Sequence, residues 1–221
     1  MLRSVGIYYH MPTKRNSTSR RSRPAKDRVL ALAHRRGVLR PRDLDAHGLP
    51  RTALHRLVAE GRMDRRGRGL YVASDAELSE SEMLAAASAR VPHAVVCLLS
   101  ALRFHGLTTQ NPADVWLAID RKARAPRGSE LPLRIVRFSG EARTAGVEEH
   151  TIDGVRVRVY SAAKTVADCF KYRGKIGLDV AIEALRDYLH TRRGSIDELW
   201  RYASVCRVTN VMRRYLEALS A

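Results

Sequence analysis

The chain has 221 residues, enough for one large or two small domains, and its apolar content of 45% is typical of a sequence that folds. It carries 40 Lys and Arg against 23 Asp and Glu, a net charge of +17, and a field of this sign attracts polyanions such as nucleic acid. No apolar run approaches the roughly 20 residues that cross a bilayer, so we expect no membrane-spanning helix and no secretion signal.

The positive charge is concentrated near the N-terminus. Residues 1–75 contain 18 Lys and Arg but 6 Asp and Glu, a net charge of +12, and the other residues contribute +5. The cysteines Cys97, Cys169 and Cys206 occur singly in apolar stretches, unlike a disulfide framework or a zinc site. We therefore predict reduced core cysteines in a cytoplasmic protein, with no metal and no other cofactor.

The basic region predicts a tail followed by a small DNA-binding domain. Residues 1–24 mix basic side chains with Ser, Thr and Asn, so we expect a disordered basic tail. Three interpretations of it stay open: a phosphate-binding arm, a solvated tail, or a start codon placed too early, with Met11 the true one. Residues 25–74 then predict three short helices and a hairpin, the order of a winged helix-turn-helix.

The third of these helices and the hairpin carry the strongest local signals. Pro50 suits a first helical turn, and Leu54, Leu57 and Val58 form an inward stripe before Gly61. Two strands, residues 63–66 and 70–72, follow and are joined by a glycine-containing turn. This hairpin would be the wing.

The remainder predicts a linker and a second domain. Residues 75–82 are polar, and residues 83–221 suggest a mixed α/β domain with a small sheet. We expect helices at residues 83–90, 94–105, 162–172, 178–190, 196–206 and 211–219, and strands at residues 115–119, 133–138 and 155–160. The predicted fold class is α+β.

A recognition helix presents its outer face to the base edges of the major groove, while the wing and neighbouring loops contact phosphates. The predicted base-reading residues on the third helix are Arg51, Thr52, His55 and Arg56. The predicted phosphate contacts are Arg40, Arg42, Arg65, Arg66 and Arg68. The expected partner is double-stranded DNA, although a solvated basic face that mediates only protein contacts would have the same composition.

Two local patterns resemble those of enzymes, but the sequence favours neither enzymatic function. Ser161 and Lys164 have the SxxK spacing of penicillin-recognising acylases, but the companion SDN and KTG motifs are missing. Asp114, Asp120 and Lys122 suggest a metal-dependent nuclease, although the two acids are close in sequence and a charged strand end explains them equally well. We therefore expect no catalytic residues.

Three stretches resemble the AbiEi family of antitoxins: GLPRTALHRLVAEGRMDRRGRGLYV, VPHAVVCLLSALRFHGLTTQNPADVWLAI and VYSAAKTVADCFKYRGKIGLDVAIEALRDYL. The resemblance covers residues 25–219 and implies a bacterial type IV toxin–antitoxin component that acts in phage defence by abortive infection. In such a protein the winged helix binds inverted repeats in its own promoter and represses transcription. The C-terminal antitoxin domain counteracts an AbiEii-like nucleotidyltransferase toxin without a stable complex.

The resemblance also suggests which residues oppose the toxin. These are the polar members of the last stretch, Lys164, Asp168, Lys171, Tyr172, Arg173 and Lys175. From residue types alone, a capped amphipathic helix with solvated charges explains the same pattern. The alternative function is a winged-helix transcriptional regulator whose C-terminal domain senses a ligand or dimerises. Symmetric operators are commonly bound by dimers, so a dimer on DNA is possible.

Overall fold

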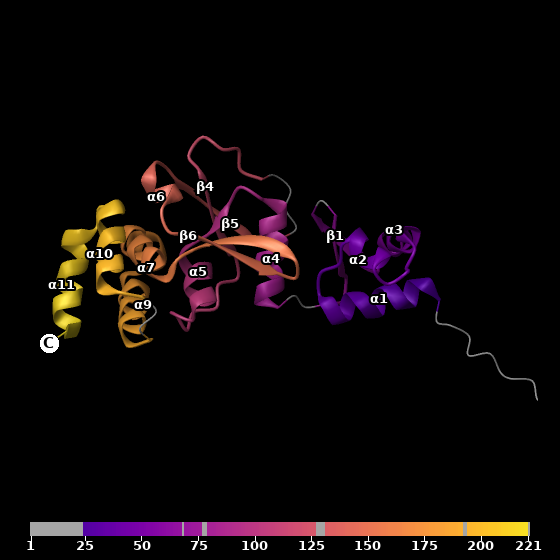
Figure 1. The fold of residues 1–221 in the computed structure, drawn as a ribbon, viewed down its shortest axis with the longest axis horizontal. Helices are drawn as coiled ribbons and strands as arrows, with labels where there is room; N and C mark the ends of the chain where they lie inside the picture. The colour runs from indigo at the N-terminus through magenta and orange to yellow at the C-terminus, as the bar shows by residue number, and fades with distance from the viewer. Residues whose placement is uncertain (1–23, 68, 77–78, 127–130, 192–193, 221) are drawn as a thin grey trace, which may run out of the picture.

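The computed structural model describes residues 24–67, 69–76, 79–126, 131–191 and 194–220, which form eleven helices and two sheets (Figure 1). This confirms the predicted α+β class. The predicted tail, apart from Pro24, lies outside the described residues. Among the described residues, no helix combines the length and the apolar character that a membrane span requires.

Residues 24–76, here called the N-terminal unit, form three helices and a two-stranded hairpin. The elements are α1 (Ala25–Arg36), α2 (Pro41–Asp45), α3 (Arg51–Ala59), β1 (Met63–Gly67) and β2 (Leu70–Ala73). An isolated bridge between Leu39 and Tyr71 adds a third short segment beside β2. Three helices, a bridging segment and a hairpin make this unit a winged helix-turn-helix, as the sequence predicts.

Residues 79–220, here called the C-terminal unit, contain a five-stranded sheet in the order β5-β4-β3-β7-β6. The strands are β3 (Val95–Val96), β4 (Val115–Asp120), β5 (Leu133–Phe138), β6 (Val147–Ile152) and β7 (Val155–Tyr160). The helices are α4 (Glu80–Arg90), α5 (Leu98–His105), α6 (Glu141–Thr144), α7 (Ala162–Lys171), α8 (Arg173–Ile176), α9 (Leu178–Thr191), α10 (Ile196–Val205) and α11 (Thr209–Ser220). The pairs β4–β5 and β3–β7 are parallel, and β3–β4 and β6–β7 are antiparallel.

Two sequence predictions are corrected. The single helix expected at residues 94–105 is wrong, because Val95 and Val96 pair with β4 and the helix begins only at Leu98. Part of the expected linker is helical, because the Ser79 side chain accepts a hydrogen bond from the Glu82 amide and starts α4. The strand β6 and the short helices α6 and α8 were not expected.

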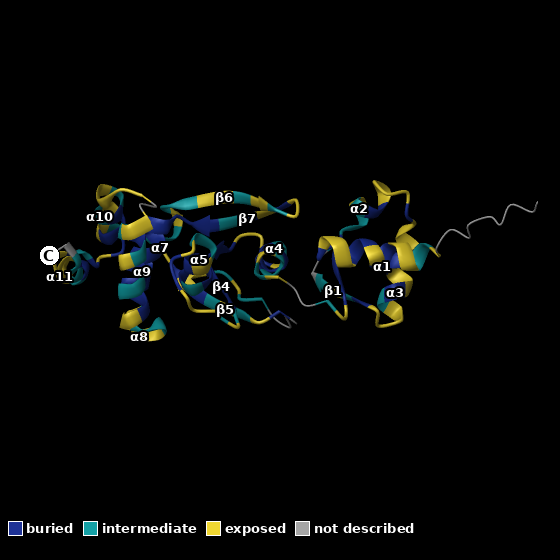
Figure 2. Cartoon of the chain, turned by 90° about the horizontal axis from the view of Figure 1, so that it is seen from below, coloured by how far each residue is buried: buried dark blue, intermediate teal, exposed yellow. Residues whose placement is uncertain are grey.

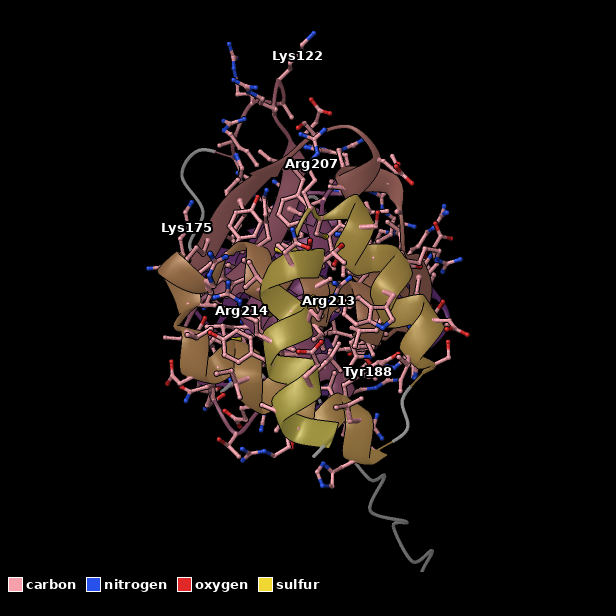
Figure 3. The ribbon with its side chains drawn as sticks, turned by 90° about the vertical axis from the view of Figure 1, so that its left-hand side faces the viewer. Lys122, Lys175, Tyr188, Arg207, Arg213 and Arg214 are labelled. Carbon is pink, nitrogen blue, oxygen red and sulfur yellow. The ribbon has the colours of Figure 1, made fainter. Side chains whose placement is uncertain are left out.

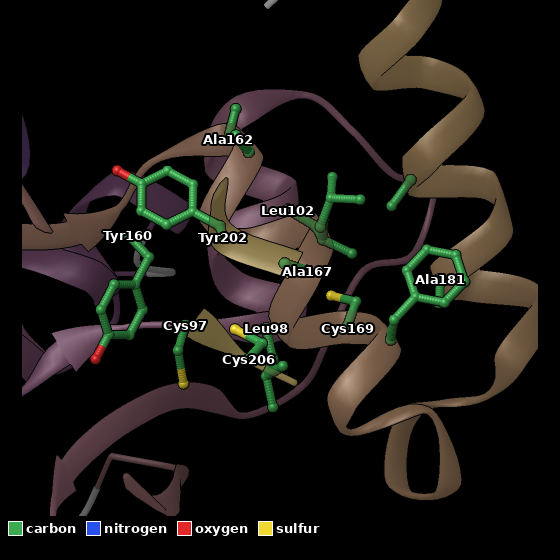
Figure 4. Packing of buried hydrophobic residues seen from close by; sticks show 14 of the residues in the cluster. Cys97, Leu98, Leu102, Tyr160, Ala162, Ala167, Cys169, Ala181, Tyr202 and Cys206 are labelled. Atoms are coloured by element: carbon green, nitrogen blue, oxygen red, sulfur yellow. The ribbon is translucent and has the colours of Figure 1, made fainter. Parts of the chain in front are cut away.

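The sheet is covered on both faces. On β4, Leu117 and Ile119 face a core that includes α4, whereas Trp116 and Ala118 face the core around α5 and α7. This alternation explains why β4 is apolar at nearly every position. All three cysteines are buried, and Figure 4 shows them among the apolar side chains of the α5–α7 core.

The wing strand β2 is buried on both sides and joins the two units. Tyr71 and Ala73 belong to the core of the N-terminal unit, whereas Leu70 and Val72 belong to the core that contains α4 and one face of the five-stranded sheet. Figures 1 and 2 show the hairpin next to α4. The wing is therefore part of the contact between the units as well as part of the winged helix.

We expect Gly37→Ala to destabilise the protein more than Gly61→Ala. Both glycines have positive φ, +65° and +67°, which strains any other residue. Gly37 has ψ of −60° and the Val38 amide donates to the Arg36 carbonyl, so Gly37 is the centre of a strained γ-turn that disfavours a Cβ more strongly. A Cβ on Gly37 would lie 1.2 Å from Glu82 Oε1, whereas a Cβ on Gly61 would meet nothing within 4 Å. Moving Glu82 removes its hydrogen bond from the Ser79 amide, adding about 1 kcal/mol.

Urea unfolding of both variants, repeated in a Glu82→Ala background, measures this difference. It should become smaller when Glu82 is absent, and the part that remains comes from the backbone strain at Gly37. An equal effect of the two substitutions in the wild-type background would contradict the described contact between Gly37 and the start of α4.

Candidate nucleic-acid interface

The recognition helix α3 separates an apolar side from a polar side. Ala53, Leu54 and Leu57 are buried, and Val58, expected to be inward, is half-buried. The four predicted base-reading residues are all exposed: Arg51, Thr52, His55 and Arg56. Among the described residues, the side chains of the last three make no hydrogen bond or ion pair. Their polar groups are thus available to an external partner.

Arg51 differs from the other three because it is paired within the protein. Its Nε lies 3.1 Å from Asp45 Oδ1, and its Nη2 donates a hydrogen bond to Asp45 Oδ2. This contact lowers the pKa of the Asp45 carboxyl below its ordinary value. A guanidinium reads guanine through two donors, so Arg56, whose fork is unoccupied, is the better candidate for direct base recognition.

The wing presents its arginines on different faces. Arg65 is exposed, whereas Arg66 is half-buried and its Nη2 donates to Asp64 Oδ2 over 3.0 Å. Arg66 is the bulged residue of β1, and its bond to Asp64, which pairs with Val72, holds its guanidinium near the side of the hairpin that faces α4. Arg68 lies outside the described residues. Arg65 is therefore the described wing residue best placed for a phosphate.

Arg40 and Arg42 have partners that the sequence did not indicate. Nη1 and Nη2 of Arg40 donate to the backbone carbonyls of Gly154 and Asp153, over 2.7 and 2.9 Å, and Arg42 Nη2 lies 3.3 Å from the Gly154 oxygen. Asp153 and Gly154 form the turn between β6 and β7. Arg40 and Arg42, which the sequence predicts to contact phosphates, therefore donate hydrogen bonds to the C-terminal unit, because this turn lies next to their side chains.

The residues predicted to oppose the toxin begin with a buried ion pair on α7. Lys164 Nζ lies 2.6 and 2.7 Å from the two carboxylate oxygens of Asp168, and the side chains are 0% and 2% exposed. Nζ also lies 4.3 Å from the ring centre of Tyr160. Cys206 Sγ donates to Asp168 Oδ1 over 3.1 Å, linking α7 to the end of α10. Burial raises the pKa of the Asp168 carboxyl to about 6, even though Lys164 opposes the shift.

The other residues of this set lie toward the C-terminal end of α7 and on α8. Lys171 and Tyr172 line a cavity together with Asp168, and the Tyr172 ring stacks on Phe138. Arg173 Nη1 donates to the Phe170 carbonyl, and Lys175 lies over the Tyr172 ring. The structure therefore brings these six residues into one region, with Lys164 out of reach of a ligand and Lys171 within reach. Burial raises the pKa of Tyr172 to about 12, so its hydroxyl keeps its proton at neutral pH.

The two acids considered for a nuclease do not come together. Asp114 and Asp120 flank the strand β4 and are six residues apart, which separates them by about 20 Å. Asp114 pairs with Arg134 and Asp120 with Arg143, at 3.2 and 3.6 Å. Two carboxylates this far apart cannot share one metal ion. No group of three or more metal-binding side chains occurs in the described part of the chain.

A winged helix with an exposed basic recognition helix defines the class of DNA-binding transcriptional regulators. Residues 27–74 match a family described as transcriptional regulator, AbiEi antitoxin, which confirms the predicted resemblance over this region. The crystal structure of the RV2827C protein from Mycobacterium tuberculosis is similar in fold, with a TM-score of 0.55 and 17% identity. The similarity covers 81% of this chain and 71% of that one and so includes much of the C-terminal unit. Comparison with curated proteins finds no matching sequence.

Sequence reasoning missed several residues around the cavity beside α7. Arg137, Arg201 and Arg207 line it but come from three separate elements. No local pattern connects them, because only the packing of β5 against α7 and α10 brings them together. Their positions relative to Lys171 could not be inferred from spacing.

We expect Lys164→Met to lower the free energy of unfolding by about 3–5 kcal/mol at pH 8, because it leaves the Asp168 carboxylate buried without its partner. Without Lys164, the folded-state pKa of Asp168 rises further above its unfolded value. A carboxyl whose pKa is raised in the folded state favours folding at low pH. This stabilisation is lost as the pH rises through the folded-state pKa. The deficit should therefore be smaller at pH 5.

Denaturant unfolding at both pH values tests this, with the double variant Lys164→Met and Asp168→Leu as the control. The double variant removes both charges and should recover most of the lost stability. A single variant as stable as the wild type at pH 8 would contradict the buried pair.

Proposed function

We propose that this protein is an antitoxin that represses its own promoter. The single observation that carries the DNA-binding part is the face of α3, where Thr52, His55 and Arg56 are exposed and unpaired among the described residues. The match of residues 27–74 to a family of transcriptional regulators supports the same role. The operator would consist of inverted repeats in the upstream DNA, with one winged helix on each half-site, and two copies of the chain bound together.

The second part of the proposal concerns the C-terminal unit, which would counteract a nucleotidyltransferase toxin without forming a stable complex with it. Support comes from the two long stretches that resemble AbiEi antitoxins and from the clustering of Asp168, Lys171 and Tyr172 around one cavity. Lys164 would act as a positioning residue, because it is fully buried beneath this surface. The protein would thereby protect bacterial cells in an abortive-infection response to phage.

On DNA, Arg56→Ala and Arg68→Ala should have different effects. Arg56→Ala removes a base contact, so it should reduce the preference for the promoter over a scrambled duplex by about tenfold. Arg68→Ala removes a phosphate contact, so it should weaken binding to both duplexes similarly and lower the salt slope by about 1. Fluorescence anisotropy titrations at several salt concentrations measure both quantities.

Arg213→Gln is the matched control for net charge, because Arg213 is exposed on α11 (Figure 3), and α11 and α3 lie at opposite ends of the molecule (Figure 1). It should change neither the preference nor the salt slope. If all three variants weakened binding equally for both duplexes, the DNA attraction would come from net charge alone, and α3 would not read sequence.

For antitoxicity, we expect co-expression of the wild type with the nucleotidyltransferase of an adjacent gene to relieve growth arrest, and Lys171→Glu to abolish the relief by reversing an exposed charge at the cavity. Arg56→Ala should retain relief, since it affects only DNA reading. Growth curves combined with immunoblots of soluble antitoxin provide the measurement. Persistent arrest in the presence of soluble wild-type protein would reject the antitoxin role.

A further inference from the structure

The cavity beside α7 has charged walls and lies in the C-terminal unit. It has a volume of about 810 Å³ and lies between the end of β5, α6 and the C-terminal ends of α7 and α10. Figure 3 views this end of the molecule and shows Arg207 at the turn between α10 and α11, with Lys122 above it. The volume is within the range of sites that hold nucleotide-sized ligands.

The lining of the cavity carries more positive than negative side chains. Its charged members are Arg137, Glu141, Asp168, Lys171, Arg201 and Arg207. Asp168 is neutralised by Lys164, which binds both of its oxygens. Arg137 contributes its backbone, because alternation along β5 puts Val136 and Phe138 on the α7 side of the sheet and the Arg137 side chain on the other side. Three cations, Lys171, Arg201 and Arg207, therefore face Glu141, and Arg201 also lies 3.7 Å from Glu198. A concave surface with this excess focuses positive potential where a ligand would lie.

One of the three cations is held in place by the protein. Arg201 Nη2 lies 3.0 Å from the Tyr202 hydroxyl and 3.7 Å from Glu198 Oε1. Fixed donors lose little conformational entropy when they bind a ligand. The cavity therefore contains a positive charge whose orientation is already fixed by the protein.

The other two cations have no partner in the described structure. The side chains of Lys171 and Arg207 make no hydrogen bond or ion pair with any described residue. A helix dipole accounts for a cation in the last turn of α7, but it does not account for the left-handed Arg207 beyond the end of α10. A ligand of opposite charge would supply the missing partners.

Arg207 occupies a backbone position that normally favours glycine. Its φ is +59°, its amide donates to the Ser204 carbonyl, and the Val208 amide donates to the Ala203 carbonyl. These bonds define a Schellman motif in which Arg207 is the left-handed residue after the helix. An arginine here is strained relative to glycine, so its presence is not explained by the stability of the turn.

We infer that this cavity binds the phosphate groups of a nucleotide-sized ligand. Several cations around one cavity suit a group with several negative charges, and guanidinium groups match phosphate geometry through paired donors. The phosphates could belong to a free nucleotide or to the end of a nucleic-acid strand. The inference goes beyond DNA binding and antitoxicity and does not depend on either.

The first test is calorimetric titration of the full chain with adenosine triphosphate and with adenosine. We expect the triphosphate to bind and adenosine, which lacks phosphate, not to bind. Arg207→Gly and Lys171→Gln should each weaken the triphosphate by at least about tenfold, as expected for a charge-assisted hydrogen bond. Arg213→Gln, which removes the same charge elsewhere on this end of the molecule, should bind as the wild type does.

Arg207→Gly separates ligand binding from folding. Glycine suits the left-handed position, so this variant should melt at the wild-type temperature or above it while losing affinity. Arg56→Ala, which tests α3, should bind adenosine triphosphate normally, so failure of DNA binding and failure of this inference are distinguishable. The inference is overturned if the triphosphate does not bind at low-millimolar concentration, or if Arg213→Gln weakens it as much as Arg207→Gly.

The source of the phosphate is decided by competition. Single-stranded RNA oligomers with and without a terminal phosphate are titrated against the triphosphate complex. Displacement that requires the terminal phosphate assigns the cavity to nucleic-acid ends, and binding of the triphosphate without displacement by either oligomer assigns it to free nucleotides. Equal displacement by both oligomers, unaffected by Arg207→Gly, would place the anion elsewhere and reject the cavity.

Discussion

The burial of β2 on both sides is the constraint on which the arrangement of the two units depends. Side chains alternate along a strand, so a strand with every residue buried must have an apolar layer on each face. Leu70 and Val72 fill one layer with α4, and Tyr71 and Ala73 fill the other with the helices of the N-terminal unit. Moving the winged helix relative to the sheet would expose one of these layers to water, which is unfavourable.

This arrangement narrows the surface that can meet DNA. Basic residues are numerous in the N-terminal third, but Arg40 and Arg42 bind the β6–β7 turn and Arg66 lies on the side of the wing that faces α4. The exposed face of α3 and the outer edge of β1 remain. The net charge therefore overstates the surface that can contact DNA. Some of the basic side chains instead stabilise the contact between the two units through hydrogen bonds to backbone carbonyls.

The sequence predicts most elements of the N-terminal unit because their signals are local, such as Pro50 at the start of α3 and the glycines of the wing. It fails where tertiary pairing decides the structure. Val95 and Val96 read as part of an apolar helix and become a strand only because β4 and β7 lie on either side. The strand β6 carries Glu148 and Glu149 at exposed positions, so apolar periodicity does not reveal it. The cationic cavity escapes prediction for a related reason, since Arg201 and Arg207 meet Lys171 only after the chain folds.

The strand β7 physically connects the cavity to the winged helix. At one end Tyr160 contacts Lys164 beneath the cavity, along its length Val157 and Val159 pack toward α4, and the turn before it is held by Arg40. A closely packed strand with a single arrangement transmits position but supplies no second state to switch into. The strand β7 is therefore a rigid spacer that fixes the distance between the cavity and the winged helix. Any coupling between ligand binding and DNA binding would need a second arrangement of the β6–β7 turn, to which Arg40 and Arg42 donate hydrogen bonds at the surface.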